Sequence, residues 1–276
     1  MTTKPPPGSI ANPILLRHRR RQEQRNPFQA EEGAALDRVR AEMVAAGLRK
    51  FPVDLAPLER AHGVADVRVV PLASRGRLIM EERGIVVEID ERLPELARRF
   101  THAHELGHLI LEEERIARCQ ALGRAVRNAS SARIYRVEHL CDIAAREMLL
   151  PESWVLSSLR GKDPSLDLVL RISDEAVVEP WLALQAIVAL GLWKVRGILW
   201  SRAQGSRSAV DTTPKANSTY LDSLEIFDPA VLEDAARSEA VARGTLGLDV
   251  QGERIKYMAE AAAVSEDEIM SLLVFD

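Results

Sequence analysis

The chain has 276 residues, of which 46% are hydrophobic and 28% are charged, and its formal net charge is −4. This composition is ordinary for a soluble globular protein with room for two modest domains, and it excludes polyanion binding through overall charge. No apolar run reaches the ~18 residues of a membrane span, no segment resembles a secretory signal, and two cysteines make no disulfide framework, so we expect a cytoplasmic protein without membrane contact.

Residues 1–28 are predicted to form a disordered basic tail. Pro5-Pro6-Pro7-Gly8 disfavours a helix, and Arg17-His18-Arg19-Arg20-Arg21 is a run of charge without apolar periodicity. A nucleic-acid-binding arm is the functional alternative to a solvated tail. We favour the tail, because a basic run by itself does not specify a ligand.

Residues 29–155 are predicted to form one domain that begins with two helices, over Ala30–Leu48 and Asp54–Gly63. Three runs rich in valine and isoleucine follow: Val67–Val70, Arg77–Met80 and Ile85–Ile89. We expect them to form a small sheet in which the last two runs make a hairpin. Such a sheet can bind an extended peptide along its edge, and we predict Ile85–Ile89 as the edge strand.

A His-Glu-x-x-His motif lies in the next predicted helix, over Pro94–Glu113. His104 and His108 are four residues apart, so their imidazoles lie on one helix face and can bind one metal ion. Glu105 can act as general base on a water, which is the arrangement of zinc metalloproteases. Two residues correspond to about 200° around a helix, so we predict that His102 is not a ligand.

A catalytic zinc site needs a third protein ligand, and the helix predicted over 132–150 supplies the best candidate. Glu138 and Asp142 lie one turn apart on one face of this helix. We predict that Glu138 binds the metal and that Asp142 accepts the second N–H of a ligating histidine. Tyr135 could stabilise an oxyanion, or it could be a packing residue. His139 is expected to point elsewhere.

These two helices together resemble the ImmA/IrrE family of metallopeptidases. The resemblance rests on Phe-Thr-x-x-His-Glu-Leu-Gly-His-Leu at 100–109 and Glu-x-x-x-Asp-x-x-Ala-x-x-x-Leu-Leu-Pro at 138–151, and it extends over about 51–200. It implies an α+β fold with a zincin-like, gluzincin-like core. The ligands implied are His104, His108 and Glu138, with Glu105 as base and Asp142 behind a histidine. The family more often has asparagine at position 142, which does not affect a ligand.

The remainder of the chain is predicted to be helical. Residues 156–205 resemble the helix-turn-helix-like region that follows the peptidase core in this family. They could bind DNA or a repressor, or they could support the active site; the predicted helix Glu179–Ala189 carries no arginine or lysine, which disfavours DNA binding. Residues 206–276 are predicted to form a polar linker and a helical C-terminal region, without the sensor-like α/β domain that some family members carry.

The joint pattern predicts a zinc-dependent endopeptidase, with manganese as the alternative metal. The family resemblance implies a protein substrate, a helix-turn-helix transcriptional repressor, whose cleavage would derepress stress or mobile-element genes. One alternative is a transcriptional regulator whose metal is structural or sensory and which binds DNA or a repressor without proteolysis. A closed site would need a fourth protein ligand, and neither His102 nor His139 is expected to supply it. The other alternative is an inactive homologue.

Overall fold

The computed structural model describes residues 27–48, 50–121, 131–201, 207–211, 224–238, 240–250 and 253–274. These ranges contain eight helices and two β-sheets, which confirms the predicted α+β class. Residues 1–28 are the predicted tail, and residues 1–26 of it lie outside the described residues. Its last two residues instead begin helix α2 (Pro27–Ala45), because proline is tolerated in a first helical turn. No described helix is both long and apolar enough to cross a bilayer.

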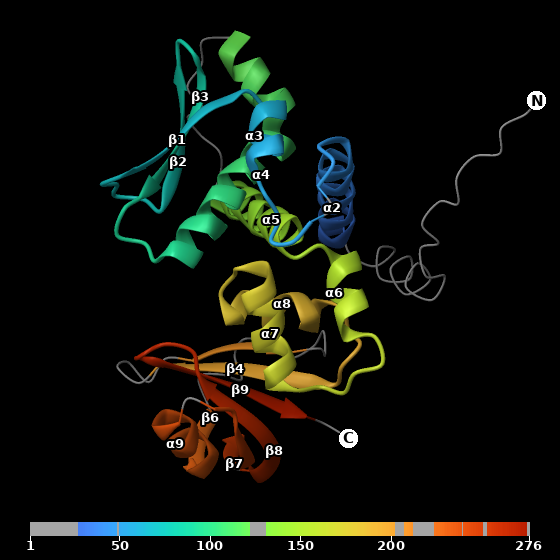
Figure 1. The fold of residues 1–276 in the computed structure, drawn as a ribbon, viewed down its shortest axis with the longest axis vertical. Coiled ribbons are helices and arrows are strands. Elements are labelled where there is room, and N and C mark those ends of the chain that lie inside the picture. Colours follow the sequence, from blue (N-terminus) through green and yellow to red (C-terminus); the bar gives the residue numbers. More distant parts are fainter. Residues whose placement is uncertain are drawn as a thin grey trace, which may run out of the picture.

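A three-stranded sheet follows the N-terminal helices (Figure 1). The elements are α3 (Ala56–Ala61), β1 (Val64–Val70), β2 (Gly76–Glu81) and β3 (Gly84–Asp90). The predicted hairpin is present, since Glu81 pairs with Gly84 in an antiparallel ladder. The predicted edge is wrong: the strand order β1-β3-β2 places Ile85–Ile89 in the centre and β2 at an edge. The run 86–90 is buried throughout, as expected for a strand with a neighbour on both sides.

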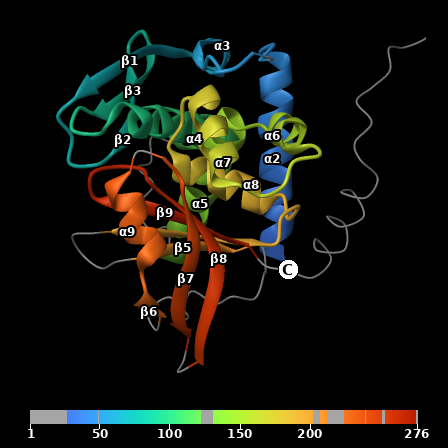
Figure 2. The ribbon, with the colours of Figure 1, turned by 60° about the horizontal axis from the view of Figure 1, so that its bottom comes forward.

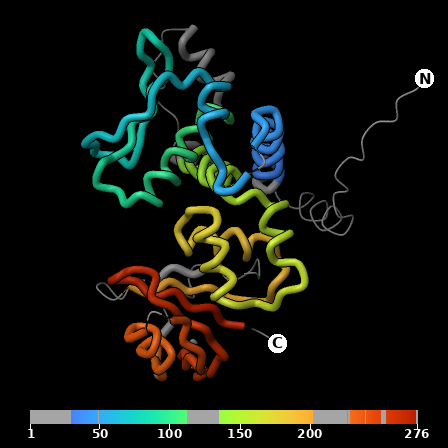
Figure 3. The backbone as a smooth tube through the Cα atoms, in the orientation of Figure 1, coloured from blue at the N-terminus to red at the C-terminus, as the bar shows by residue number. Residues whose placement is uncertain are grey.

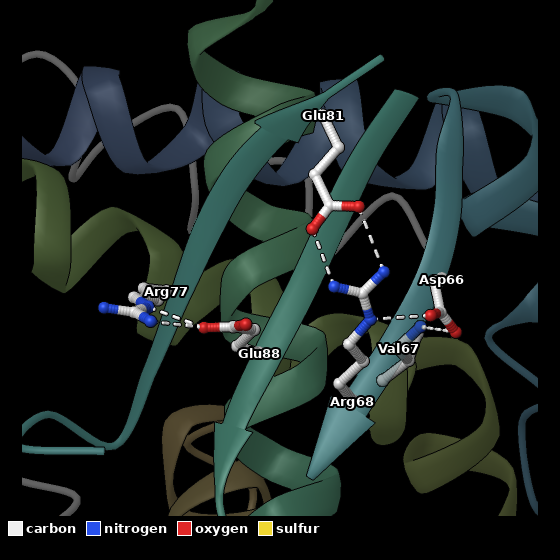
Figure 4. A network of polar contacts seen from close by, with 6 residues as sticks. All are labelled: Asp66, Val67, Arg68, Arg77, Glu81 and Glu88. Atoms are coloured by element: carbon white, nitrogen blue, oxygen red, sulfur yellow. Dashed lines mark hydrogen bonds and ion pairs between the residues drawn. The ribbon is translucent and has the colours of Figure 1, made fainter. Parts of the chain in front are cut away.

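Charged side chains cover one face of this sheet (Figure 4). Arg68 on β1 donates to both carboxylate oxygens of Glu81 on β2, at 2.6 and 3.0 Å, and to Asp66 at 2.8 Å. On the same face, Arg77 donates to Glu88 at 2.7 Å. The exposed pairs of Arg68 contribute about 0–1 kcal/mol each, whereas Glu88 is buried beneath Arg77, so we regard these side chains as a polar cover over the central strand. The opposite face packs against the helix that carries the histidine motif.

Two helices cross beside the sheet, α4 (Glu95–Ala121) and α5 (Ser131–Leu149) (Figure 3). They confirm the helices predicted over 94–113 and 132–150, although α4 is longer. Gly107 lies at the crossing, where a Cβ would be 3.3 Å from the Cβ of Ala144 and from main-chain atoms of Cys141. The missing side chain lets the helices approach closely, which explains a glycine at a position where it lowers helix propensity.

Three helices and a strand occupy the predicted helical region 156–205. They are α6 (Glu152–Leu159), α7 (Leu166–Ala176), α8 (Pro180–Ala189) and β4 (Val195–Ser201). Six of the ten residues of α8 are buried. They share one hydrophobic core with Leu109 of α4, Met148 of α5 and Met270 near the C-terminus. A helix buried in this way cannot enter a DNA groove without leaving its core, so the fold favours the supporting role.

Where the C-terminal region is described, it is an antiparallel sheet with one helix, so the predicted helical region is wrong; residues 212–223, which include part of the predicted linker, lie outside the described residues. Its further elements are β5 (Arg207–Asp211), β6 (Leu224–Asp228), α9 (Ala230–Arg237), β7 (Ala242–Val250), β8 (Glu253–Ala263) and β9 (Glu268–Val274). The strand order is β5-β4-β9-β8-β7-β6. Helix α9 packs on one face, and α7 and α8 pack on the other (Figures 1 and 2).

Strand periodicity in β8 shows why the helical prediction failed. Ile255, Met258 and Ala262 recur at helical spacing, and alanine and glutamate favour helices. In the structure successive side chains face opposite sides of the sheet instead: Ala259 and Ala261 pack in the core with α9, Ala262 packs in the other core, and Met258 is 66% exposed. Pairing with β7 and β9, the strands that directly precede and follow β8 in the chain, therefore outweighs helix propensity here.

Candidate metal centre

The crossing of α4 and α5 brings together the three predicted ligands. The ligand atoms of His104, His108 and Glu138 lie within 4.8 Å of one another. Nε2 of His104 lies 3.2 Å from one oxygen of Glu138, and Nε2 of His108 lies 3.6 Å from the other. The two imidazoles therefore direct the same ring nitrogen toward one carboxylate, and the three side chains surround a common point.

Asp142 occupies the position behind His104. Its Oδ1 lies 2.8 Å from Nδ1 of His104. An Nδ1–H that donates to this carboxylate fixes the tautomer in which Nε2 carries a lone pair toward Glu138. Burial lowers the pKa of His104, but the hydrogen bond and charge of Asp142, with the charges of Glu105 and Glu138, outweigh it and raise the pKa. A proton and a metal ion thus compete for this imidazole.

Glu105 is buried between α4 and the edge strand. A Cβ on Gly76, the first residue of β2, would lie 2.7 Å from Oε1 of Glu105 and 2.7 Å from Cγ2 of Thr101. The carboxylate is therefore in contact with the main chain of the strand. Burial, helped by the charge of Glu138 and opposed by that of His104, raises the pKa of Glu105 to about 7. A carboxylate with such a pKa can take up and release a proton near neutral pH.

The two neighbouring histidines point away from the ligand cluster, as predicted. Nε2 of His102 lies 3.3 Å from Glu59 on α3, and burial, with the charge of Arg99, lowers its pKa to about 4. Nε2 of His139 lies 2.9 Å from Glu32 on α2. Neither ring can supply the fourth protein ligand that a closed site would need.

The donor set fits a catalytic metal. Two imidazoles and one carboxylate are a ligand set that zinc uses in hydrolases, where the fourth position is left for water. Imidazole and carboxylate together also suit manganese. Tyr135 lies one turn before Glu138 on α5 and is 74% exposed, so its proposed contact with an oxyanion stays a prediction.

Two residues at this centre were not predicted from the sequence. Gly76 offered a signal, because a glycine in a strand often marks close approach of another group. Glu32 offered none, since its contact with His139 joins helices far apart in the chain.

The Peptidase_M78 family model, described as "IrrE N-terminal-like domain", matches residues 65–178. Among solved structures, 11 chains match. One is a Mycobacterium tuberculosis transcriptional regulator with 17% sequence identity and a TM-score of 0.55, and the match covers 86% of this chain and 86% of that chain. At this identity the likeness shows a shared fold alone, which extends well beyond residues 65–178. No curated protein matches the chain.

Proposed function

We propose that the protein is a metal-dependent endopeptidase, and the match of residues 65–178 to the Peptidase_M78 model, described as an IrrE N-terminal-like domain, supports the proposal. One observation carries the proposal: His104, His108 and Glu138 converge while Asp142 orients one of the imidazoles. Zinc is the metal that this donor set favours, with manganese as the alternative.

Five residues would have three separate roles in hydrolysis. His104, His108 and Glu138 would hold the cation, which supplies Lewis acidity toward a peptide carbonyl and toward water. Asp142 would keep the Nε2 lone pair of His104 in place. Glu105 would take a proton from the attacking water on its carboxylate and deliver it to the leaving nitrogen. Its raised pKa suits both steps.

The edge strand β2 gives a path for the substrate. Main-chain groups on an antiparallel strand face its neighbour at every second residue, and Asp90 N donates to Arg75 O at 2.8 Å. By this alternation Gly76, Leu78 and Met80 direct their N–H and C=O groups away from β3, toward the open edge. An extended peptide that pairs there would run beside Glu105. The peptide-binding strand is thus β2, in place of Ile85–Ile89.

We further propose a helix-turn-helix transcriptional repressor in the cytoplasm as the substrate, cut to derepress stress or mobile-element genes. The support for this finer statement is the resemblance of the two ligand helices to the ImmA/IrrE family. The structural neighbour, described as a transcriptional regulator, is consistent with a role in gene control.

Incubation of the purified protein with zinc or manganese and candidate repressors tests the proposal. We expect fragments with the wild type, and at least a 100-fold slower reaction with Glu105→Gln, because a positioned general base contributes about 10²–10⁴-fold. Equal rates for both proteins would remove Glu105 from its role. A panel of repressors left intact by the wild type in either metal would remove the substrate class.

A regulator that acts without proteolysis is the second candidate, which the description of the structural neighbour favours. Burial of α8 and its lack of basic residues speak against DNA reading by this helix. DNA binding that is specific in sequence and unchanged by Glu105→Gln would support this second candidate.

A further inference from the structure

Helix α2 lies outside the segment that matches the family, yet it packs along the ligand helix α5 (Figure 1). Three polar contacts join the two helices at successive levels. They are Glu31 to Arg136 at 3.2 Å, Glu32 to His139 at 2.9 Å, and Arg40 to Glu147 at 2.6 Å. The middle contact is the one nearest to Glu138 and Asp142 along α5.

The metal-facing side of α5 has little packing to hold it. The side chains of Glu138 and Asp142 are 50% and 56% exposed. His139 directly follows Glu138, and adjacent residues on a helix are about 100° apart. The contact of His139 with Glu32 therefore adds to the buried packing of α5 in setting the rotation of this helix, and with it the direction in which Glu138 leaves the helix.

We propose that Glu32 is a positioning residue of the metal centre: by bonding His139, it helps to hold α5 in the rotation at which Glu138 and Asp142 meet His104. This inference rests on the proposed metal-dependent function. It adds α2, an N-terminal helix that the family match does not include, to the elements that position the proposed metal ligands.

Zinc affinity and the absorption spectrum of bound cobalt test this role without any substrate. Loss of an outer contact to a metal site weakens binding about 10–100-fold. We expect a zinc dissociation constant at least 10-fold higher for Glu32→Ala, measured by competition with a chromophoric chelator, and altered cobalt d–d bands. Glu31→Ala is the matched control, because its ion pair with Arg136 is more exposed, and should change affinity less than 3-fold.

His139→Ala should cause a similar loss, and the double variant with Glu32→Ala should be less than additive, since both remove one contact. In Glu32→Gln the amide oxygen can still accept a hydrogen bond from His139, so its zinc affinity should lie between those of Glu32→Ala and the wild type. If Glu32→Ala is unfolded before metal is added, Glu32→Gln tests the positioning role in its place. Wild-type affinity and an unchanged cobalt spectrum in both Glu32 variants would overturn the positioning role alone. A wild type that binds no zinc or cobalt would overturn the metal centre and this inference together.

Discussion

Gly76 and Glu105 are in contact: a Cβ on the glycine would lie 2.7 Å from Oε1 of the carboxylate. The edge strand that is proposed to pair with substrate thus touches the proposed general base through its main chain. Substrate path and base are fixed relative to each other because one glycine lets α4 lie directly against β2.

Gly76→Ala is expected to lower kcat by about 10–100-fold, because the added methyl displaces the flexible end of Glu105 and a misplacement of about 1 Å can cost ~10²-fold. The zinc dissociation constant should not change, since the atoms nearest to the added methyl belong to Glu105 and Thr101 and not to the three proposed ligands. Steady-state kinetics and zinc titration on the same preparation measure both. Arg77→Ala, on the opposite face of the strand, is the control and should keep wild-type kcat. Equal kcat values for the two variants would contradict the contact as a catalytic one.

Asp142→Ala should weaken zinc binding about 10–100-fold, because Nδ1 of His104 loses the acceptor that fixes its tautomer. Asp142→Asn should lose less, since an amide oxygen still accepts from an Nδ1–H. Competition titrations at neutral pH give both constants. An Ala variant that binds zinc as tightly as the Asn variant would show that the ring is oriented by other contacts.

His102 should make the metal-free protein less stable in acid. Its pKa is about 4 in the fold, below the ordinary 6.5, so it is neutral in both folded and unfolded chains above pH 6.5. As the pH falls from 6.5 to about 4, only the unfolded chain takes up this proton, and the free energy of unfolding falls by about 3 kcal/mol. Urea unfolding in EDTA at several pH values should show this loss.

The matched variant for that experiment is His102→Gln, which should lack this part of the pH dependence. Protonation of the remaining histidines affects both proteins equally and cancels in the difference. Parallel curves for wild type and variant between pH 7 and 4 would argue against a buried neutral imidazole at position 102.

Met270→Ala should destabilise the part of the molecule that contains the proposed metal centre as well as the C-terminal sheet. Met270 is fully buried in a core that also contains Leu109 of α4 and Met148 of α5. Truncation of such a residue costs about 2–5 kcal/mol. Circular dichroism and tryptophan fluorescence should report a single unfolding transition, shifted together. Arg243→Ala, which removes only exposed ion pairs with Asp167 and Glu260, should cost about 1 kcal/mol or less. Two separate transitions would instead mean that the halves unfold independently.

The sequence by itself determined the two pairs of side chains from which the proposed metal centre is built. Four-residue spacing places His104 and His108 on one face of a helix, and the same spacing places Glu138 and Asp142 on one face of another. These are local relations within single helices, so they hold whatever surrounds them. The three strands of the small sheet were also predictable, because β-branched runs and a short turn are local signals.

Only the tertiary structure decided which strand forms the edge of the small sheet, how the chain folds after residue 190, and which residues pack behind α5. The order β1-β3-β2 depends on a parallel pairing between strands that a further strand separates in the chain. The C-terminal sheet depends on pairing that overrides helix-forming residues, and the contact of Glu32 with His139 joins residues 107 positions apart. The stability of such contacts depends on segments that are far apart in the chain. It therefore cannot be read from the spacing of residues within one segment.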